Sequence, residues 1–97
     1  MDQVEIELRG EIDVDVSEAL REQVLQAVRE AAGRPVAIDM ADVTFIDSSG
    51  LSALLSGLRL ARGHGGTIRL ANVGPQIHRI FEVTGLQEQF GMDRTSP

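Results

Sequence analysis

Short apolar stretches alternate along this chain with longer stretches whose apolar residues recur at helical spacing, and few folds fit such an order. Val4, Ile6 and Leu8 alternate with charged residues, which predicts a strand with one buried face. Residues 36–40 are almost continuously apolar, which predicts a central strand covered on both faces. Residues 67–71 read as a third strand.

Helices are expected between and after these strands. Apolar residues follow a helical stripe over 16–32, where Asp15 with Glu18 resembles a capping box and Ser17 is a second candidate cap. Leucines at positions i, i+3, i+4 and i+7 predict a second helix, and a shorter third helix is expected to end at Gly85. The strand and helix order predicts an α/β fold, with helices packed on a mostly parallel sheet.

The size and residue content suit one soluble globular domain. We expect residues 1–97 to form it, with a core over about 4–90 and a frayed tail over 91–97. The chain has no cysteine and only two widely separated histidines, so neither a disulfide nor a metal site is expected. It lacks a signal peptide pattern and an apolar run long enough to span a bilayer, which favours a cytoplasmic protein without a membrane partner.

The negative net charge argues against a nucleic acid or an anionic membrane as the main partner. Nine arginines and no lysine stand against 15 acidic residues, which leaves a net charge of −6. Such a chain is a poor ligand for a nucleic acid or for an anionic lipid surface. With three phenylalanines and no tryptophan or tyrosine, a docking surface must depend on small side chains and backbone.

The string Asp47-Ser48-Ser49-Gly50 stands between an apolar strand end and the leucine-bearing helix. Asp or Ser at this place caps the unpaired N–H groups of a helix, and capping explains the string without any further function. The same N–H groups and the helix dipole would also stabilise a phosphoryl group. Capping alone does not decide between Ser48 and Ser49 as an acceptor.

The helix that follows is unusual because residues 48–58 carry no charged side chain. The face opposite its leucines is small and largely polar or neutral. A helix lying on the outside of a sheet would keep this face free, which predicts a docking surface for a protein partner. Its residues are Ser49, Ser52, Ala53, Ser56, Gly57 and Leu60.

Other chemistry is excluded by the local sequence. Residues 63–66 are rich in glycine but join a helix to a strand and lack the lysine of a phosphate-binding loop. Ser48 and Ser49 lack a Gly-x-Ser-x-Gly elbow and a neighbouring base, so a serine hydrolase is not expected. Asp13 and Asp47 are interpreted as structural or surface acids rather than a catalytic pair. We predict a protein without enzymatic activity or cofactor.

Several segments together resemble the STAS domain of bacterial anti-sigma factor antagonists. The resemblance covers Val4 to about Phe90, and the Asp-Ser-Ser-Gly-Leu block is its most specific part. It implies a single STAS-type domain, with a mixed, mostly parallel sheet and three to four helices packed mainly on one face. The segments are Gly10-Glu11-Ile12-Asp13, Ile38-Asp39-Met40, Val43 to Leu51, Gly65-Gly66, and Ile80 to Leu86 with Phe90.

The resemblance also implies a function. In this family, the serine that matches Ser48 is phosphorylated by the partner anti-sigma factor, a serine kinase, and the unphosphorylated form binds that kinase and frees the sigma factor. Asp13, Asp47 and the opening of the second helix, with Ser49 and Gly50, would contribute to docking. The expected protein is thus a partner-switching regulator of transcription that is monomeric when free. The alternative is a STAS accessory subunit of a lipid-transport or anion-transport system without a kinase switch.

Overall fold

The computed structural model describes residues 3–92 of the chain. Strands and helices alternate along it in the order that the apolar pattern predicts. A 3-10 turn over Leu86–Glu88 precedes the last strand. The elements are β1 (Val4–Ile12), α1 (Ser17–Ala31), β2 (Val36–Ile46), α2 (Ser48–Gly63), β3 (Ile68–Ala71), α3 (Pro75–Thr84) and β4 (Gly91–Met92).

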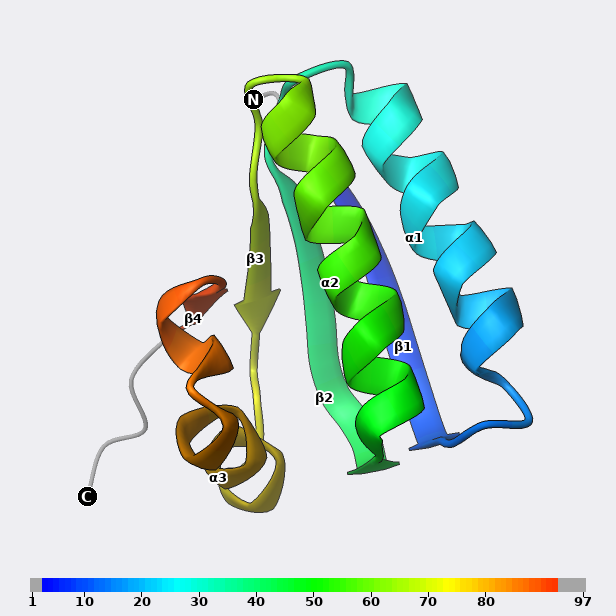
Figure 1. The fold of residues 1–97 in the computed structure, drawn as a ribbon, viewed down its shortest axis with the longest axis vertical. Helices are drawn as coiled ribbons and strands as arrows, with labels where there is room; N and C mark the ends of the chain where they lie inside the picture. Colours follow the sequence, from blue (N-terminus) through cyan, green and yellow to red (C-terminus); the bar gives the residue numbers. More distant parts are fainter. Residues whose placement is uncertain (1–2, 93–97) are drawn as a thin grey trace.

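The four strands form one sheet in the order β1-β2-β3-β4. Every pair is parallel within residues 3–92, and the register places Val4 beside Val36 and Val36 beside Ile68. Both α1 and α2 lie over the same face of the sheet, and α3 lies beyond the end of β3 (Figure 1). The predicted α/β class is confirmed, with a wholly parallel sheet among the described strands in place of the mixed one.

The core lies between the sheet and the two long helices. Val36, Ile38 and Met40 of β2 are completely buried, together with Val24 of α1 and Leu54 of α2. Near the C-terminal end of the described chain, the rings of Phe81 on α3 and Phe90 before β4 meet edge to face, with centroids 5.7 Å apart. This contact ties α3 to the segment that leads into β4, so the short last strand is held by packing as well as by pairing.

Two predicted boundaries are wrong. The central strand predicted over 36–40 and the apolar strand end before Asp47 are one continuous strand, Val36–Ile46. The apolar pattern does not show this continuity, because two irregularities in the β1–β2 register, one of them beside Gly10 with its φ of +80°, interrupt the alternation. The frayed tail expected over 91–97 is wrong for Gly91 and Met92, because both residues pair with β3. Residues 93–97 lie outside the described part of the chain.

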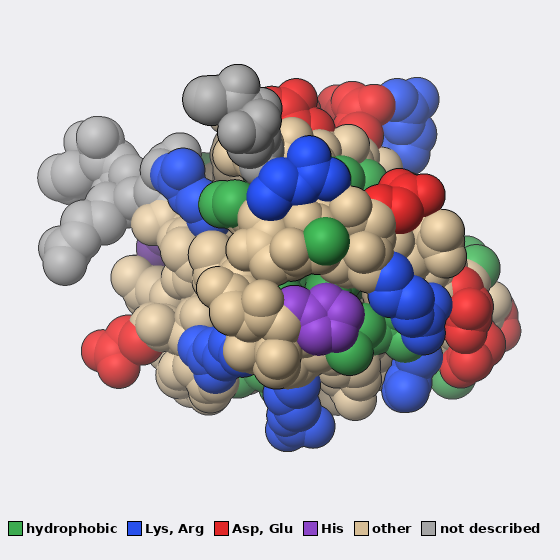
Figure 2. All heavy atoms as spheres, turned by 90° about the horizontal axis from the view of Figure 1, so that it is seen from above, with side chains coloured by type: hydrophobic (Ala, Val, Ile, Leu, Met, Phe, Trp, Pro, Cys, Tyr) green, Lys and Arg blue, Asp and Glu red, His purple; other side chains and the backbone are tan. Residues whose placement is uncertain are grey.

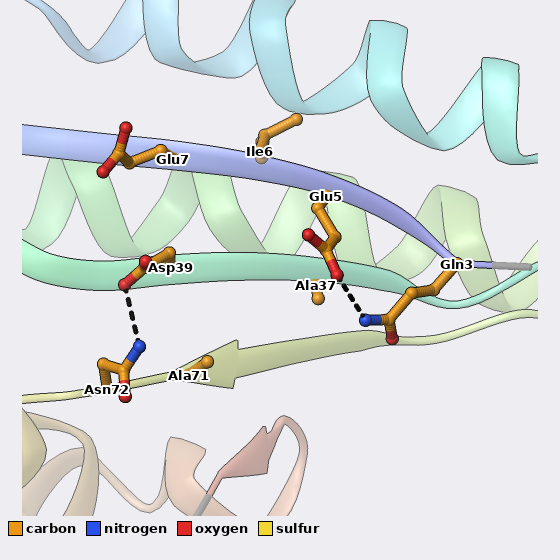
Figure 3. Close-up of a pocket in the computed structure, with 8 residues that line it drawn as sticks. All are labelled: Gln3, Glu5, Ile6, Glu7, Ala37, Asp39, Ala71 and Asn72. Atoms are coloured by element: carbon orange, nitrogen blue, oxygen red, sulfur yellow. Dashed lines mark hydrogen bonds between the residues drawn. The ribbon is translucent and has the colours of Figure 1, made fainter. Parts of the chain in front are cut away.

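The opposite face of the sheet carries no helix among the described residues. β2 is central as predicted, but it is covered on one face only, since Ala37 and Asp39 remain half-exposed. A hollow of about 420 Å³ lies on this face, where Gln3 donates to Glu5 (2.8 Å) and Asn72 donates to Asp39 (3.2 Å) (Figure 3). The hollow is lined by Gln3, Glu5, Ile6, Glu7, Ala37, Asp39, Ala71 and Asn72.

None of the helices described over residues 3–92 is both long and apolar enough to cross a bilayer.

Candidate functional site

The start of α2 is held to the end of β1. The Asp47 N–H donates to the Ile12 carbonyl over 3.1 Å, and the backbone of Asp47 is extended. One carboxylate oxygen of Asp47 then accepts from the N–H groups of Ser49 (3.0 Å) and Gly50 (3.3 Å). Asp47 is therefore the N-cap of α2, and it fixes the turn that presents the two serines.

The two serines have different surroundings. The Ser49 side chain is half-buried, and its hydroxyl donates to the same Asp47 oxygen over 2.6 Å. Ser48 is exposed at the first residue of α2, and no hydrogen bond within residues 3–92 engages its hydroxyl. The Ser48 hydroxyl is therefore the more accessible of the two.

The Ser49 hydroxyl also sets the acidity of the cap. Its hydrogen bond is the largest cause that lowers the pKa of the Asp47 carboxyl below its ordinary value. Desolvation opposes this shift, and the N–H groups of Gly50 and Ser49 add to it. Asp47 is thus held as an anion beside Ser48.

Replacing Asp47 with alanine is expected to lower the Tm by about 4–8 °C at neutral pH, because α2 loses its cap. The folded pKa of Asp47 lies below the unfolded one, so the carboxylate's contribution is complete above about pH 4 and is lost as the pH falls through the folded pKa. The Tm difference between variant and wild type should therefore shrink in acid, as followed by circular dichroism.

Asp15→Ala is the matched control for this experiment. The helix α1 has Val16 as its N-cap and no side-chain capping bond, so the predicted capping box of Asp15 and Glu18 is wrong. The Ser17 hydroxyl donates to the Val14 carbonyl instead of capping. Asp15→Ala should leave the Tm unchanged, and an Asp47→Ala deficit that stays constant down to acid pH would contradict the role given to the ionised cap.

Asp13 lies at the same end of the sheet as Asp47. It directly follows Ile12, whose carbonyl binds the Asp47 N–H. The half-buried Asp13 carboxylate accepts from the Asp15 N–H over 3.0 Å, which closes the turn between β1 and α1. The structure thus brings Asp13, Asp47, Ser48 and Ser49 to one place, at the carboxyl ends of two neighbouring strands.

The prediction that small residues keep one face of α2 free for a partner is wrong for Ala53 and Gly57. Ala53 is 1% exposed, and a Cβ added to Gly57 would stand 2.3 Å from a methyl group of Val24 on α1. The small residues let α1 approach α2 closely, so the domain itself covers this face. Of the other residues on that face, Ser52 is exposed, whereas Ser56 and Leu60 are half-buried.

Gly50 is buried as well. A Cβ there would stand 2.7 Å from Ile12 and 2.8 Å from Ile46, so the absent side chain lets α2 begin directly on the strand ends. The role expected for Gly50 in partner binding is therefore corrected to a packing role. The surface left around Ser48 consists of Asp13, Asp47, Ser49 and Ser52, with Ser56 further along the helix.

Sequence reasoning missed three exposed apolar side chains at this end. Val14 is 71% exposed, Phe45 46% and Val16 41%. Val14 and Val16 belong to the turn before α1, and Phe45 lies two residues before Asp47. The available signal was a pair of valines in a turn between acidic residues, where no strand or helix would bury them.

Charge is distributed unequally between the two ends of the helices. Five acidic residues and no arginine occur within 10–18 and 43–52, around the start of α2, whereas Asp42, earlier on β2, pairs with Arg9 of β1. Arginines occur in the last turns of both helices, at Arg29 and Arg62. Figure 2 views that far end, where arginine side chains lie around a central histidine and acidic side chains lie toward the margins. The acidic residues of the Ser48 end are Glu11, Asp13, Asp15, Glu18 and Asp47.

A parallel sheet with its helices on one face and an exposed serine at a capped helix start is the architecture of a STAS domain. The family model described as "Mlab, STAS domain" matches residues 1–92, and the chain belongs to this family.

Its relatives include anti-sigma factor antagonists. The anti-sigma-B factor antagonist of Bacillus subtilis is 29% identical over 85 residues, which are 88% of this chain and 76% of the relative. The anti-sigma F factor antagonist of Paenibacillus polymyxa is 30% identical over 81 residues, which are 84% and 69% of the two chains.

Solved structures of the antagonist SpoIIAA from Bacillus share the fold. The unphosphorylated form gives a TM-score of 0.78 and the phosphorylated form 0.70, each at 26% identity and over 96% of this chain. The matched parts are 81% and 84% of those two chains. The same fold thus occurs with and without a phosphate in a relative.

Proposed function

We propose that this chain is an anti-sigma factor antagonist that binds a serine kinase when Ser48 is free and is released when Ser48 carries a phosphate. The observation that carries the proposal is the contrast between the two serines. Ser48 is exposed at the start of α2, whereas the Ser49 hydroxyl is bound to Asp47 at 2.6 Å. The names of the relatives support the same role.

The start of α2 can accept a phosphate without unfolding. A phosphoserine adds about −1.5 to −2 charges and three acceptor oxygens, and a helix N-terminus stabilises such an anion. The neighbouring Asp47 is already ionised and bound to Ser49 and Gly50, so it stays in its capping position. Phosphorylation therefore changes the charge and shape of the surface and leaves the fold unchanged.

Release follows from the charges that the transfer leaves behind. The γ-phosphoryl group passes from a nucleoside triphosphate to the Ser48 oxygen as its bond to the nucleoside diphosphate breaks, a base of the kinase takes the hydroxyl proton, and the products are a phosphoserine and a nucleoside diphosphate. These two anions face one another inside the contact, with Asp47 beside them, and they repel in a poorly hydrated interface. A 10- to 100-fold loss of affinity requires only about 1.4–2.8 kcal/mol.

In this role the chain is a substrate and a ligand rather than a catalyst. The kinase supplies the nucleotide and the catalytic groups, and the antagonist acts as one cytoplasmic domain that changes partners.

The test is a calorimetric titration of the kinase with the two forms of the protein. We expect the phosphorylated form to bind at least about tenfold more weakly. Equal affinity of both forms would contradict the proposal. Co-purification with a transport subunit as the sole protein partner, without phosphorylation, would favour the alternative role in transport.

A further inference from the structure

The outer edge of β1 is free of any other strand in the described part of the chain. β1 has nine residues and ends the sheet on one side, so within residues 3–92 it has a neighbouring strand on its inner side alone. The opposite edge of the sheet is β4, which has two residues. An edge strand presents unpaired N–H and C=O groups with which a further strand can pair. Of the two edges, β1 is the one long enough to accept such a strand.

The hydrogen bonds at the two ends of β1 show which backbone groups point outward. The Val4 N–H donates to the residue before β2 over 3.0 Å, and the Ile12 carbonyl accepts from the residue after β2 over 3.1 Å. Both residues therefore direct their backbone groups toward β2. Because successive residues of a strand direct these groups to opposite sides, Glu5, Glu7 and Glu11 direct theirs to the outer edge.

A groove of about 220 Å³ lies along this edge, between β1 and α1. Figure 1 shows α1 beside β1, on the side away from β2. On the α1 side of the groove, Val16 is 41% exposed, and Ala19 and Gln23 are exposed. A strand paired with β1 would lie about 4.8 Å from it, and its side chains on the helix face would cover these residues. The groove is bordered by Glu7, Leu8, Arg9, Ile12, Val16, Ala19, Leu20 and Gln23.

The side chains of β1 on the uncovered face of the sheet define the charge of a fitting strand. Glu5, Glu7 and Glu11 are exposed, and Arg9 binds Glu7 at 2.7 Å, so negative charge is in excess. Side chains on the same face of neighbouring strands interact, and basic residues would complement this row. A second copy of β1 would add the same excess of glutamates and fits less well.

We propose that the free edge of β1 binds an extended segment of a protein partner, in which basic residues alternate with apolar ones, as an additional strand of the sheet. The outward backbone groups of Glu5 and Glu7 provide the pairing, and the apolar residues enter the groove beside α1. The start of α2 is bonded to the inner side of β1, so a segment on the outer side leaves Ser48 exposed. The inference goes beyond the proposed function and does not depend on it.

The test is an NMR titration of the protein with the peptide acetyl-Lys-Val-Lys-Val-Lys-Val-Lys-amide. We expect a Kd below about 1 mM and slower amide hydrogen exchange at Glu5 and Glu7, with little change at Val4 and Ile6, whose N–H groups point to β2. The matched control peptide has proline in place of the central valine. It carries the same charge but cannot form a regular strand, so it should bind at least about tenfold more weakly.

Equal binding of the two peptides would show that charge alone attracts them, and it would overturn the inference. Exchange at Glu5 and Glu7 that is already slow in the free protein would overturn it as well, because a second copy or another segment of the chain would then cover the edge. Either result leaves kinase binding and Ser48 phosphorylation as separate measurements, so the proposed function would stand.

Two variants at Glu7 separate the backbone from the side chain. Glu7→Pro removes an outward N–H, which an edge strand tolerates, and should weaken peptide binding at least about tenfold. Glu7→Gln keeps the N–H and should bind within about threefold of wild type. Ala19→Phe changes an exposed residue of α1 and fills the groove, so it tests the same site should the proline variant fail to fold. Unchanged peptide binding by Ala19→Phe would contradict the inference.

Discussion

Ser48→Ala is expected to reduce phosphoryl incorporation by the kinase at least about 100-fold, while Ser49→Ala keeps it within a few-fold of wild type. Removing the Ser48 hydroxyl removes the attacking oxygen itself. Removing the Ser49 hydroxyl only weakens the hold on Asp47, whose carboxylate still accepts from two backbone N–H groups. The measurement is the rate of phosphate incorporation at saturating kinase and nucleotide.

Both variants are suitable because neither should unfold the domain. Ser48 is exposed at the first residue of α2, so its change to alanine should alter stability by less than about 0.5 kcal/mol. Equal incorporation in Ser48→Ala and wild type, or loss confined to Ser49→Ala, would show that the acceptor has been assigned wrongly.

Gly57→Ala is expected to have the largest effect on stability, a loss of about 1–3 kcal/mol. The added Cβ would stand 2.3 Å from a methyl group of Val24 and 3.2 Å from Ile68, so α1 and α2 must move apart. In a domain of this size the loss corresponds to a Tm decrease of about 4–8 °C for each kcal/mol. Circular dichroism is the appropriate probe because the chain has no tryptophan or tyrosine.

Gly63→Ala is the matched control in the same helix. A Cβ there meets no atom within 4 Å, and because Gly63 is the last residue of α2, the variant should be at least as stable as wild type, with a gain below about 1 kcal/mol. Propensity favours alanine in both variants, so a loss of stability confined to Gly57→Ala reports the packing against α1. Unchanged or higher stability of Gly57→Ala would refute the helix contact described here.

The apolar pattern predicted most of the fold because each element has its own period. The helix expected over 16–32 occurs at Ser17–Ala31, and the strand starting at Val36 is central. The pattern could not show that β2 continues through the irregular segment to Ile46, where the register shifts disturb the alternation. Nor could it predict β4, because two residues are too few to have a period.

The helix cap at the candidate site was predicted, but the packing around it was not. Asp47 caps α2, as capping preferences predict. The choice between Ser48 and Ser49 required the structure, because a serine at either position suits a helix start. Only the geometry shows which of the two hydroxyls is hydrogen-bonded. Small residues such as Ala53 and Gly57 suit either a partner or a neighbouring helix, and only the position of α1 decides between them.

The most direct test of the partner switch is to add ATP to a preformed complex of the kinase with this protein and to follow dissociation and Ser48 phosphorylation in the same sample. We expect the wild-type complex to dissociate as phosphate accumulates on Ser48, and the Ser48→Ala complex to persist. A wild-type complex that stays intact after Ser48 is fully phosphorylated, or a Ser48→Ala complex that dissociates equally fast, would contradict the account.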